Sequence, residues 1–471
     1  MKKTKFLSGI ICLGLMGVML LNLTGCKTEK NNILHSTATP QITPSPIVSQ
    51  SPLPTKDPLP TESQSPVATS TPSIERKEVL ATNLMSDIKA SAISEKLLSD
   101  AFIASQMKLS VDLFKSSVSE SQNKNVLISP LSIQLALAMT ANAADGQTKQ
   151  EMESLLGNEI SLDELNQYLY TYIKNLPTSE KYKLGIANSI WFRDSENLTV
   201  DANFLQTNAN YYGAEIYKET FDNQTLTDIN NWVYNNTDGM IDGIIDSIEP
   251  TNMMYLINAL VLDAEWEHVY NKIAINEGKF KSISGQERTV EMMASDEYKY
   301  ISDENARGFI KDYKDSKYSF AALLPNEDIN IYDYINSFTS ESLANTLQNI
   351  QSERTSVLLP KFSYEYELCM NDVLSSLGMP TAFDSNHADF SKGMQILSGN
   401  NIYIDKVQHK TIITVDELGT KAGAVTSVDM ATESAPQNYI TLDRPFVYMI
   451  MDNSTNLPIF IGAVTDIASA K

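Results

Sequence analysis

A succession of apolar runs most constrains what this chain can fold into. Each run is rich in Val, Ile, Leu, Phe and Tyr and is bounded by polar or turn residues, which is typical of β-strands. The runs cover residues 184–192, 253–266, 318–325, 356–368, 402–415, 446–452 and 457–464. Patterns with helical spacing lie among them, at residues 102–118, 133–144 and 225–237. Strands interspersed with helices predict one large α+β domain.

The first 25 residues have the layout of an export signal. Three lysines within the first five residues precede an apolar, uncharged run, and the sequence LTGC, ending at Cys26, follows it. LTGC resembles the bacterial lipobox, which implies cleavage before Cys26 and acylation of its thiol. The apolar run is also long enough for a membrane-spanning anchor. We expect residues 1–25 to be a lipoprotein signal peptide, with Cys26 tethering an extracellular protein to the outer face of the bacterial cell membrane.

A spacer follows the signal. Residues 36–73 hold nine of the eighteen prolines, separated by Ser and Thr, and such a segment cannot bury a core. Extended at roughly 3.1 Å per residue, it would reach about 100 Å. It is either a stalk through the cell wall or an unselected linker, and in both cases the folded part comes after it. We assign residues 26–97 to the spacer and residues 98–471 to the folded domain.

Charge and cysteine content exclude several classes of protein. The net charge of −22 argues against a nucleic-acid partner, which would need a concentrated basic surface. Of the three cysteines, Cys12 leaves with the signal and Cys26 would be acylated, so Cys369 has no disulfide partner. In its Leu-Cys-Met context Cys369 reads as a small core side chain, and less well as a nucleophile.

No arrangement of residues predicts an enzyme. The four histidines, His35, His268, His387 and His409, form no HExxH or HxH pattern. The Gly-x-Ser-x-Gly elbow, the P-loop and the dinucleotide fingerprint are also absent from the sequence. We therefore expect no catalytic residues, no cofactor and no metal.

The stretch DELGTKAGAVTSVDMATESAPQ (416–437) interrupts the last group of strands. It is long for a connection without structure of its own, and such loops are usually functional. Alternate residues are small or apolar without exception: Thr420, Ala422, Ala424, Thr426, Val428, Met430 and Thr432. Every charge between them lies on the other parity. This is the pattern of a strand with one buried face, although its glycines and alanines give it little strand propensity of its own.

The segment ELGTKAGA (417–424) closely resembles the hinge of the reactive-centre loop in inhibitory serpins. Other matches to that family occur in family order: NVLISPLS (125–132), LINAL (256–260) with Trp266, LPKF (359–362), LGM (377–379) with ADFS (388–391), DRPF (443–446) and PIFIG (458–462). Together they span about residues 98–468. The chain departs from the family where Asp263-Ala264 replaces the usual Lys-Gly before the tryptophan.

The resemblance implies a fold and a mechanism. It implies the serpin fold, an α+β architecture of three large mixed or antiparallel sheets, about eight to nine helices and an exposed loop. It also implies a monomer that inhibits a serine or cysteine protease as a suicide substrate. The protease cleaves the loop and forms an acyl-enzyme, and the loop then inserts into the central sheet and traps the protease covalently. The alternative is a non-inhibitory serpin that acts as a binding or chaperone-like module.

The resemblance assigns roles residue by residue. The hinge comprises Glu417, Gly419, Thr420, Ala422 and Ala424, and its inward residues must be small if the loop is to enter the sheet quickly. A polar cluster beneath the sheet, called the shutter, comprises Ser129, Ser132, Asn258 and His409. Trp266 matches the tryptophan where insertion begins, and it also reads as an ordinary core aromatic. His409 taken alone would be an ordinary half-buried histidine.

The bond that the protease cuts follows from spacing along the loop. In the family it commonly lies seventeen residues along from the hinge glutamate, which gives the bond between Glu433 and Ser434. Because the span from Thr420 to Pro445 is about one residue longer than usual, the bonds after Thr432, Ala431 or Met430 stay open. Glu433 would favour proteases that prefer an acidic residue.

Overall fold

The structure, a computed structural model, describes residues 74–194, 198–249, 251–396, 401–420 and 436–469. All of these residues lie in one of the chain's two units, Ser70–Lys471. The helices found within them are α1 (Asp100–Glu120), α2 (Pro130–Ala141), α3 (Gly146–Gly157), α4 (Leu162–Asn175), α5 (Ala202–Tyr212), α6 (Asn223–Asn236), α7 (Ile331–Asn336), α8 (Ser340–Gln348) and α9 (Asn371–Ser376), with short 3-10 turns at Lys272–Ala274, Lys314–Ser316 and Thr381–Phe383. Helices and strands are interspersed along the chain, as the sequence predicts.

The strands form three large sheets and a two-stranded ribbon. Sheet A has the order β1 (Thr82–Asn83), β5 (Glu215–Glu219), β3 (Tyr182–Arg193), β6 (Met254–Glu265), β16 (Gly419–Thr420), β15 (Lys406–Val415), β13 (Phe362–Cys369). Sheet B has the order β2 (Val126–Ile128), β19 (Leu457–Val464), β18 (Phe446–Asp452), β11 (Tyr318–Pro325), β10 (Ala306–Asp312), β9 (Lys299–Ser302). Sheet C has the order β17 (Asn438–Thr441), β12 (Thr355–Pro360), β8 (Glu287–Glu297), β7 (Ile275–Lys281), and the ribbon pairs β14 (Met394–Ile396) with β4 (Leu198–Val200).

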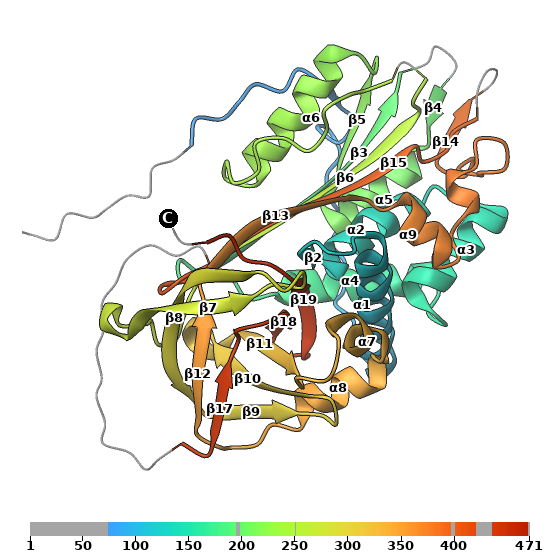
Figure 1. Ribbon diagram of the computed structural model, residues 1–471. Helices are drawn as coiled ribbons and strands as arrows, with labels where there is room; N and C mark the ends of the chain where they lie inside the picture. Colours follow the sequence, from blue (N-terminus) through green and yellow to red (C-terminus); the bar gives the residue numbers. More distant parts are fainter. Residues whose placement is uncertain (1–73, 195–197, 250, 397–400, 421–435, 470–471) are drawn as a thin grey trace, which may run out of the picture. The chain divides into compact units, whose positions relative to one another are not determined.

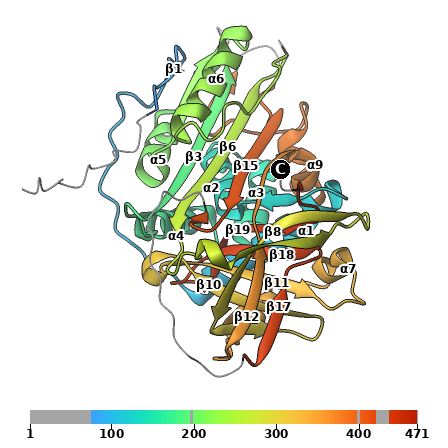
Figure 2. The same ribbon diagram turned by 60° about the vertical axis from the view of Figure 1, so that its left-hand side comes forward.

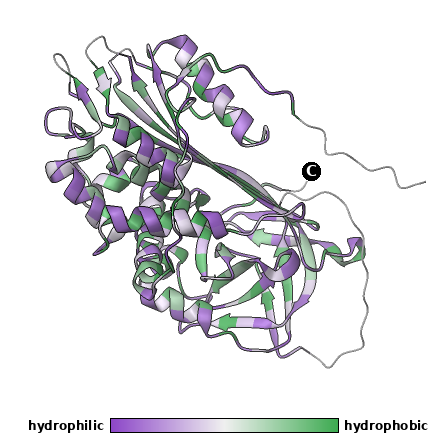
Figure 3. Cartoon of the chain, turned by 180° about the vertical axis from the view of Figure 1, so that it is seen from behind, coloured by the Kyte–Doolittle hydropathy of each residue, from purple (hydrophilic) through white to green (hydrophobic). Residues whose placement is uncertain are grey.

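Helix α2 lies between sheets A and B. Ser129 caps its first turn by accepting the backbone N–H of Ser132, and Pro130 occupies the first helical position, where no N–H is needed. Every residue of the helix is buried, because it packs against β3 and β6 on one side and β19 on the other. Hydrophobic residues concentrate on the strands, while the outer helices present polar sides (Figure 3).

A second, smaller core covers the other face of sheet A. Figure 1 shows α6 on this face, opposite α1 and α2. Trp232 and Val233 of α6 pack there against side chains of the sheet such as Trp191 and Tyr217, whose stacked rings lie 4.1 Å apart. On this face α6 covers the part of sheet A around β3, whereas alternate residues of β15 and β13 stay partly exposed.

The predicted run 356–368 is two strands rather than one. It divides at Lys361, with β12 in sheet C and β13 in sheet A. Pro360 is the last residue of β12, and proline cannot donate to a ladder. Lys361 is thereby placed between two sheets.

Residues that the sequence assigned to the spacer take part in the folded unit. The strand β1 pairs with β5, with Thr82 opposite Lys218. Lys77 exchanges backbone hydrogen bonds of 2.8 and 2.7 Å with the side-chain amide of Asn235 on α6. These contacts bring residues from Lys77 onward into the folded unit, ahead of the boundary at residue 98 that the sequence predicted.

Candidate functional site

The site is the place in sheet A where β6 and β15 part. The two strands pair in parallel from Lys406 opposite Tyr255 to Thr411 opposite Leu260, and they run side by side in both views (Figures 1 and 2). Beyond that point the short strand β16 lies between them. It pairs antiparallel with β6, through Gly419 opposite Glu265, and with β15, through Thr420 opposite Val415. The start of the 416–437 stretch is therefore already part of the sheet.

A tight turn reverses the chain from β15 into β16. The Asp416 carboxylate accepts the backbone N–H groups of Leu418 at 2.8 Å and Gly419 at 3.2 Å, which is an Asx-type turn. The same turn presents three carbonyl groups to the segment after β6. Asp416 accepts the indole N–H of Trp266, Leu418 the Trp266 backbone N–H and Glu417 the Tyr270 backbone N–H, each at 2.9 Å. Trp266 thus lies against this turn, and its role at the start of insertion stays a prediction.

Gly419 is required by this close pairing. A Cβ atom at this position would lie 2.0 Å from the carbonyl oxygen of Ala264 on β6, which is far inside van der Waals contact. Any side chain here would push β16 away from its neighbour. Gly419 therefore allows the backbone of β16 to lie close to the backbone of β6.

Thr420 is the first loop side chain to enter the core. It is 2% exposed, and its hydroxyl lies 2.5 Å from the Tyr313 hydroxyl. Tyr313 stacks on Trp266, with ring centroids 4.4 Å apart and planes 9° apart. Thr420 thus points into the core, and its role as a hinge residue stays a prediction. Sequence reasoning missed Tyr313 and Tyr270, because only the fold brings them to the hinge.

The hinge carboxylate is held by the lysine that lies between β12 and β13. Glu417 and Lys361 form an ion pair of 2.8 Å, and each side chain is 22% exposed. The hydrogen bond from Lys361 is the main reason that the pKa of Glu417 lies below its usual value. The sequence predicts Lys361 within the LPKF motif but gives it no role.

The predicted shutter residues come together beneath this site. His409 on β15 accepts the backbone N–H of Ser129 at 3.2 Å through Nε2, and its Nδ1 hydrogen-bonds the side-chain oxygen of Asn258 on β6. The Asn258 amide donates to the Ser132 hydroxyl at 2.5 Å. It also donates to Asn188 of β3 at 2.5 Å, a member of the cluster that sequence reasoning missed.

This geometry fixes the charge state of His409. Since Nε2 accepts a hydrogen bond, Nδ1 carries the single ring proton. Complete burial lowers the pKa of His409 from 6.5 to about 3. The imidazole is therefore neutral at any moderate pH, and it joins β15, β6 and the start of α2 without placing a charge beneath the sheet.

We expect His409 to make stability depend on pH. Because its folded pKa lies below its unfolded pKa, its contribution is complete above pH 6.5 and is lost as pH falls towards 3. At pH 5 the loss relative to pH 7.5 is about 2 kcal/mol, at 1.36 kcal/mol per pKa unit. The variant His409→Gln keeps a donor and an acceptor but cannot be protonated. Urea midpoints of both proteins from pH 7.5 to 5 should converge as pH falls, and parallel curves would refute the assignment.

The remaining predicted residues do not enlarge the site. Ala422, Ala424, Glu433, Ser434 and Cys26 lie outside the described residues. Cys369, expected in the core, is exposed at the end of the edge strand β13, so that interpretation is wrong.

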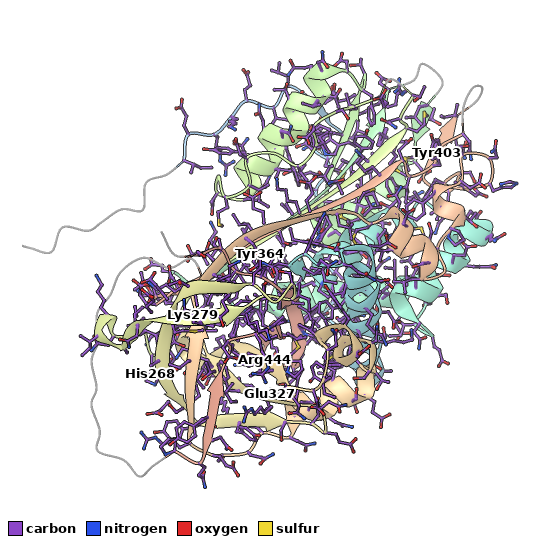
Figure 4. All side chains as sticks on the ribbon, viewed as in Figure 1. His268, Lys279, Glu327, Tyr364, Tyr403 and Arg444 are labelled. Carbon is purple, nitrogen blue, oxygen red and sulfur yellow. The ribbon has the colours of Figure 1, made fainter. Side chains whose placement is uncertain are left out.

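Other kinds of site find no support in the described part of the chain. It contains no group of three or more His, Cys, Asp or Glu side chains that could hold a metal ion. Figure 4 labels His268, in the connection after β6, and Tyr403, which precedes β15; the two side chains lie in different parts of the molecule and form no common site. Across the same described residues, no helix combines the length and the apolar character needed to cross a membrane.

The class of protein is defined by its fold: a seven-stranded sheet A in which the short strand β16 lies between β6 and β15, packed through helix α2 against sheet B. The family described as Serpin (serine protease inhibitor) matches residues 104–467. The chain belongs to the serpin family. Serpins are generally protease inhibitors and not enzymes.

Relatives with solved structures have the same fold. The native-state structure of the thermophilic serpin tengpin is 50% identical, covers 82% of this chain and 100% of its own, and superposes with a TM-score of 0.79. Its latent-state structure is 49% identical, covers 80% of this chain and 100% of its own, and gives a TM-score of 0.71. The predicted serpin fold is therefore confirmed.

Curated relatives come from distant organisms. A serpin-like protein of Thermococcus kodakarensis is 28% identical over 350 residues, which cover 72% of this chain and 80% of the relative. Serpin B10 of Papio anubis is 28% identical over 403 residues, covering 77% and 98% respectively.

Proposed function

We propose that this protein inhibits a serine or cysteine protease as a suicide substrate, by inserting its cleaved loop between β6 and β15. The observation that carries the proposal is β16, whose residues Gly419 and Thr420 already occupy that position with antiparallel partners on both sides. Thr420 is small and buried, so the first side chain to enter needs no rearrangement of the core. Ala422 and Ala424 continue the same parity with smaller side chains still.

The sheet itself supplies a driving force. Below β16, β6 and β15 pair with each other in parallel, which is slightly less stable per residue than antiparallel pairing. Extending β16 would replace that ladder by two antiparallel ladders and bury the apolar parity of the loop. Opening the sheet breaks the hydrogen bond between His409 and Asn258, which lie opposite each other on β15 and β6. His409 keeps the backbone N–H of Ser129 as a partner and Asn258 keeps the Ser132 hydroxyl, so neither side chain is left without a hydrogen bond.

The reaction starts as ordinary proteolysis. The nucleophile of the protease attacks the carbonyl carbon of Glu433, the peptide bond breaks, and Ser434 leaves with a protonated amine. Glu433 remains joined to the protease as an ester or thioester. Glu433 lies thirteen positions beyond Thr420, and as a strand this stretch spans roughly 43 Å. Insertion therefore moves the attached protease along the length of sheet A before water completes hydrolysis.

The cleaved bond sets the target class. With Glu433 before the bond, the target is a protease whose specificity pocket offers a cation. The bonds after Thr432, Ala431 and Met430 are the alternatives, and cleavage at one of them would favour a pocket for a small or apolar side chain.

We also propose that Cys26 carries the lipid that anchors the protein outside the cell, with residues 1–25 removed as a signal peptide. A single acyl chain binds membranes only marginally, so a diacyl anchor is the arrangement that would hold the protein firmly. Expressed in a bacterium with a lipoprotein pathway, the protein should fractionate with membranes and Cys26→Ser should not. Equal membrane association of the two would reject the anchor.

The proposal is tested by incubating residues 70–471 with glutamate-specific, elastase-like and subtilisin-like proteases and resolving the products on a denaturing gel. A band that survives denaturation, at the summed mass of the protease and the large fragment, is the expected result. Each protease with its nucleophile blocked is the control and should give no band. Cleavage without a complex across the whole panel would reject inhibition and favour the non-inhibitory alternative.

A further inference from the structure

A buried ion pair lies directly beneath the hinge. Lys311 of β10 and Glu297 at the end of β8 approach to 2.7 Å, with side chains 4% and 12% exposed. Lys311 is the only buried lysine or arginine among the described residues. Burial acts to lower the pKa of Lys311, but the Glu297 carboxylate, with Tyr270 and Asp312, outweighs it and leaves the pKa raised. Lys311 is therefore charged.

The ammonium group faces the two aromatic residues that hold the hinge turn. Lys311 Nζ lies 4.5 Å from the ring centre of Tyr270 and 5.5 Å from that of Trp266, within the range of cation–π attraction. These rings meet edge to face, with centroids 6.5 Å apart. Through their N–H groups, Trp266 and Tyr270 bind all three carbonyls of the Asp416–Leu418 turn. Only one layer of side chains separates the ion pair from the loop.

A buried ion pair of this kind contributes more to the positions of neighbouring side chains than to the free energy of folding. Replacing a buried ion pair with apolar residues of similar size is often neutral or stabilising, because desolvation offsets the attraction between the charges. Two fixed charges nevertheless hold their neighbours in one arrangement. In this fold those neighbours are Tyr270 and Trp266, the residues on which the turn rests.

The turn matters because every stage of insertion shares it. The chain passes from β15 through Asp416–Leu418 into β16 whether β16 has two residues or many. Lengthening β16 then resembles closing a hairpin from a turn that already exists, without the loop-closure entropy of forming the turn first. A loosely held turn would have to be ordered during the short life of the acyl-enzyme.

We propose that Lys311 and Glu297 are positioning residues for loop insertion: through Tyr270 and Trp266 they hold the Asp416–Leu418 turn in the geometry from which β16 lengthens. This inference rests on the proposed inhibitory function. The pair touches neither the protease nor the cleaved bond, so it acts on the competition between insertion and hydrolysis and not on recognition of the loop.

Three variants separate positioning from general stability. Lys311→Met with Glu297→Gln removes both charges and keeps the size of both side chains. Lys311→Arg keeps a cation beside the rings and should rescue function. Lys299→Met is the matched control, since Lys299 forms a 2.7 Å pair with Asp312 on the neighbouring strand but is 39% exposed.

Two readouts are measured on each variant: amide hydrogen exchange of residues 416–420 against that of the core strand β18, and moles of inhibitor consumed per mole of protease trapped. In the double variant we expect exchange at 416–420 to accelerate at least about tenfold, with β18 unchanged. The inhibitor consumed should rise at least about threefold, because more acyl-enzyme is hydrolysed. Lys311→Arg and Lys299→Met should match the wild type in both.

Unchanged exchange at 416–420 in the double variant overturns the proposal. Acceleration of the same size in β18 also overturns it, since the pair would then serve stability alone. If the wild type traps no protease, inhibition itself fails, and hydrogen exchange alone decides whether the pair positions the turn. If the double variant does not fold, Glu297→Asp replaces it. That variant keeps both charges but withdraws the carboxylate by one methylene, and the same comparison applies.

Discussion

Thr420→Arg should convert the inhibitor into a substrate: the protease should cleave the loop at the normal rate, and less than about a tenth of it should end in a stable complex. Thr420 is 2% exposed and lies against Tyr313, so an arginine there must either enter the core unpaired or keep β16 out of the sheet. An uncompensated buried charge costs about 3–5 kcal/mol. Since each 1.36 kcal/mol is a factor of ten in rate, insertion would slow by about 100-fold or more.

Thr414→Arg is the matched control for this experiment. Thr414 lies on β15 in the same sheet, but it is only half-buried and its hydroxyl contacts Ser363 at the surface. It should trap protease as the wild type does. The measurement is the ratio of complex to cleaved inhibitor on a denaturing gel. A Thr420→Arg protein that traps protease as well as Thr414→Arg would count against insertion as the inhibitory step.

Glu433→Arg should redirect inhibition from acid-preferring proteases to trypsin-like proteases. The side chain before the cleaved bond enters a specificity pocket, where reversed charge leaves two like charges facing each other. We expect the second-order rate of inhibition to fall at least about 100-fold for a glutamate-specific protease and to rise by a similar factor for trypsin.

Scanning the neighbouring positions identifies the bond independently. Thr432→Arg, Ala431→Arg and Met430→Arg move the cation back along the loop one residue at a time. Only the variant with arginine immediately before the natural bond should gain inhibition of trypsin while keeping the natural insertion length. Gain at one of these three positions, with none at 433, would move the assignment to that position.

The sequence predicted those strands whose apolar pattern and flanking turn residues lie within one short segment. The strands β11, β18 and β19 have the predicted bounds, since each is a short apolar run between turn residues. The burial of Thr420 followed from the period-2 alternation of its loop, because that alternation is a property of any strand.

What the sequence did not reveal depends on contacts between distant segments. Asn188 and Lys311 lie in β3 and β10, and Tyr313 follows β10; nothing in their local sequence indicates a role at a site. Only the arrangement of the sheets brings Asn188 to Asn258 and brings Tyr313 and Lys311 to the hinge. Cys369 was misplaced for the related reason that its apolar sequence neighbours say nothing of the exposed side of an edge strand. Residues 74–97 lack a long apolar run, so pairing with β5 could not be anticipated from them.

The central claim is that the loop becomes a strand of sheet A once it is cut, and the melting temperature of the loop-cleaved protein tests it most directly. Intact protein, protein cleaved within residues 421–435 and cleaved Thr420→Arg are compared by calorimetry. At ~2.1 cal/mol/K per residue, a gain of about 10 kcal/mol from insertion raises the Tm of a domain this size by roughly 10 °C. We predict a rise of at least that size for the cleaved wild type and little change for cleaved Thr420→Arg. A cleaved wild type that melts at or below the temperature of the intact protein would contradict the account.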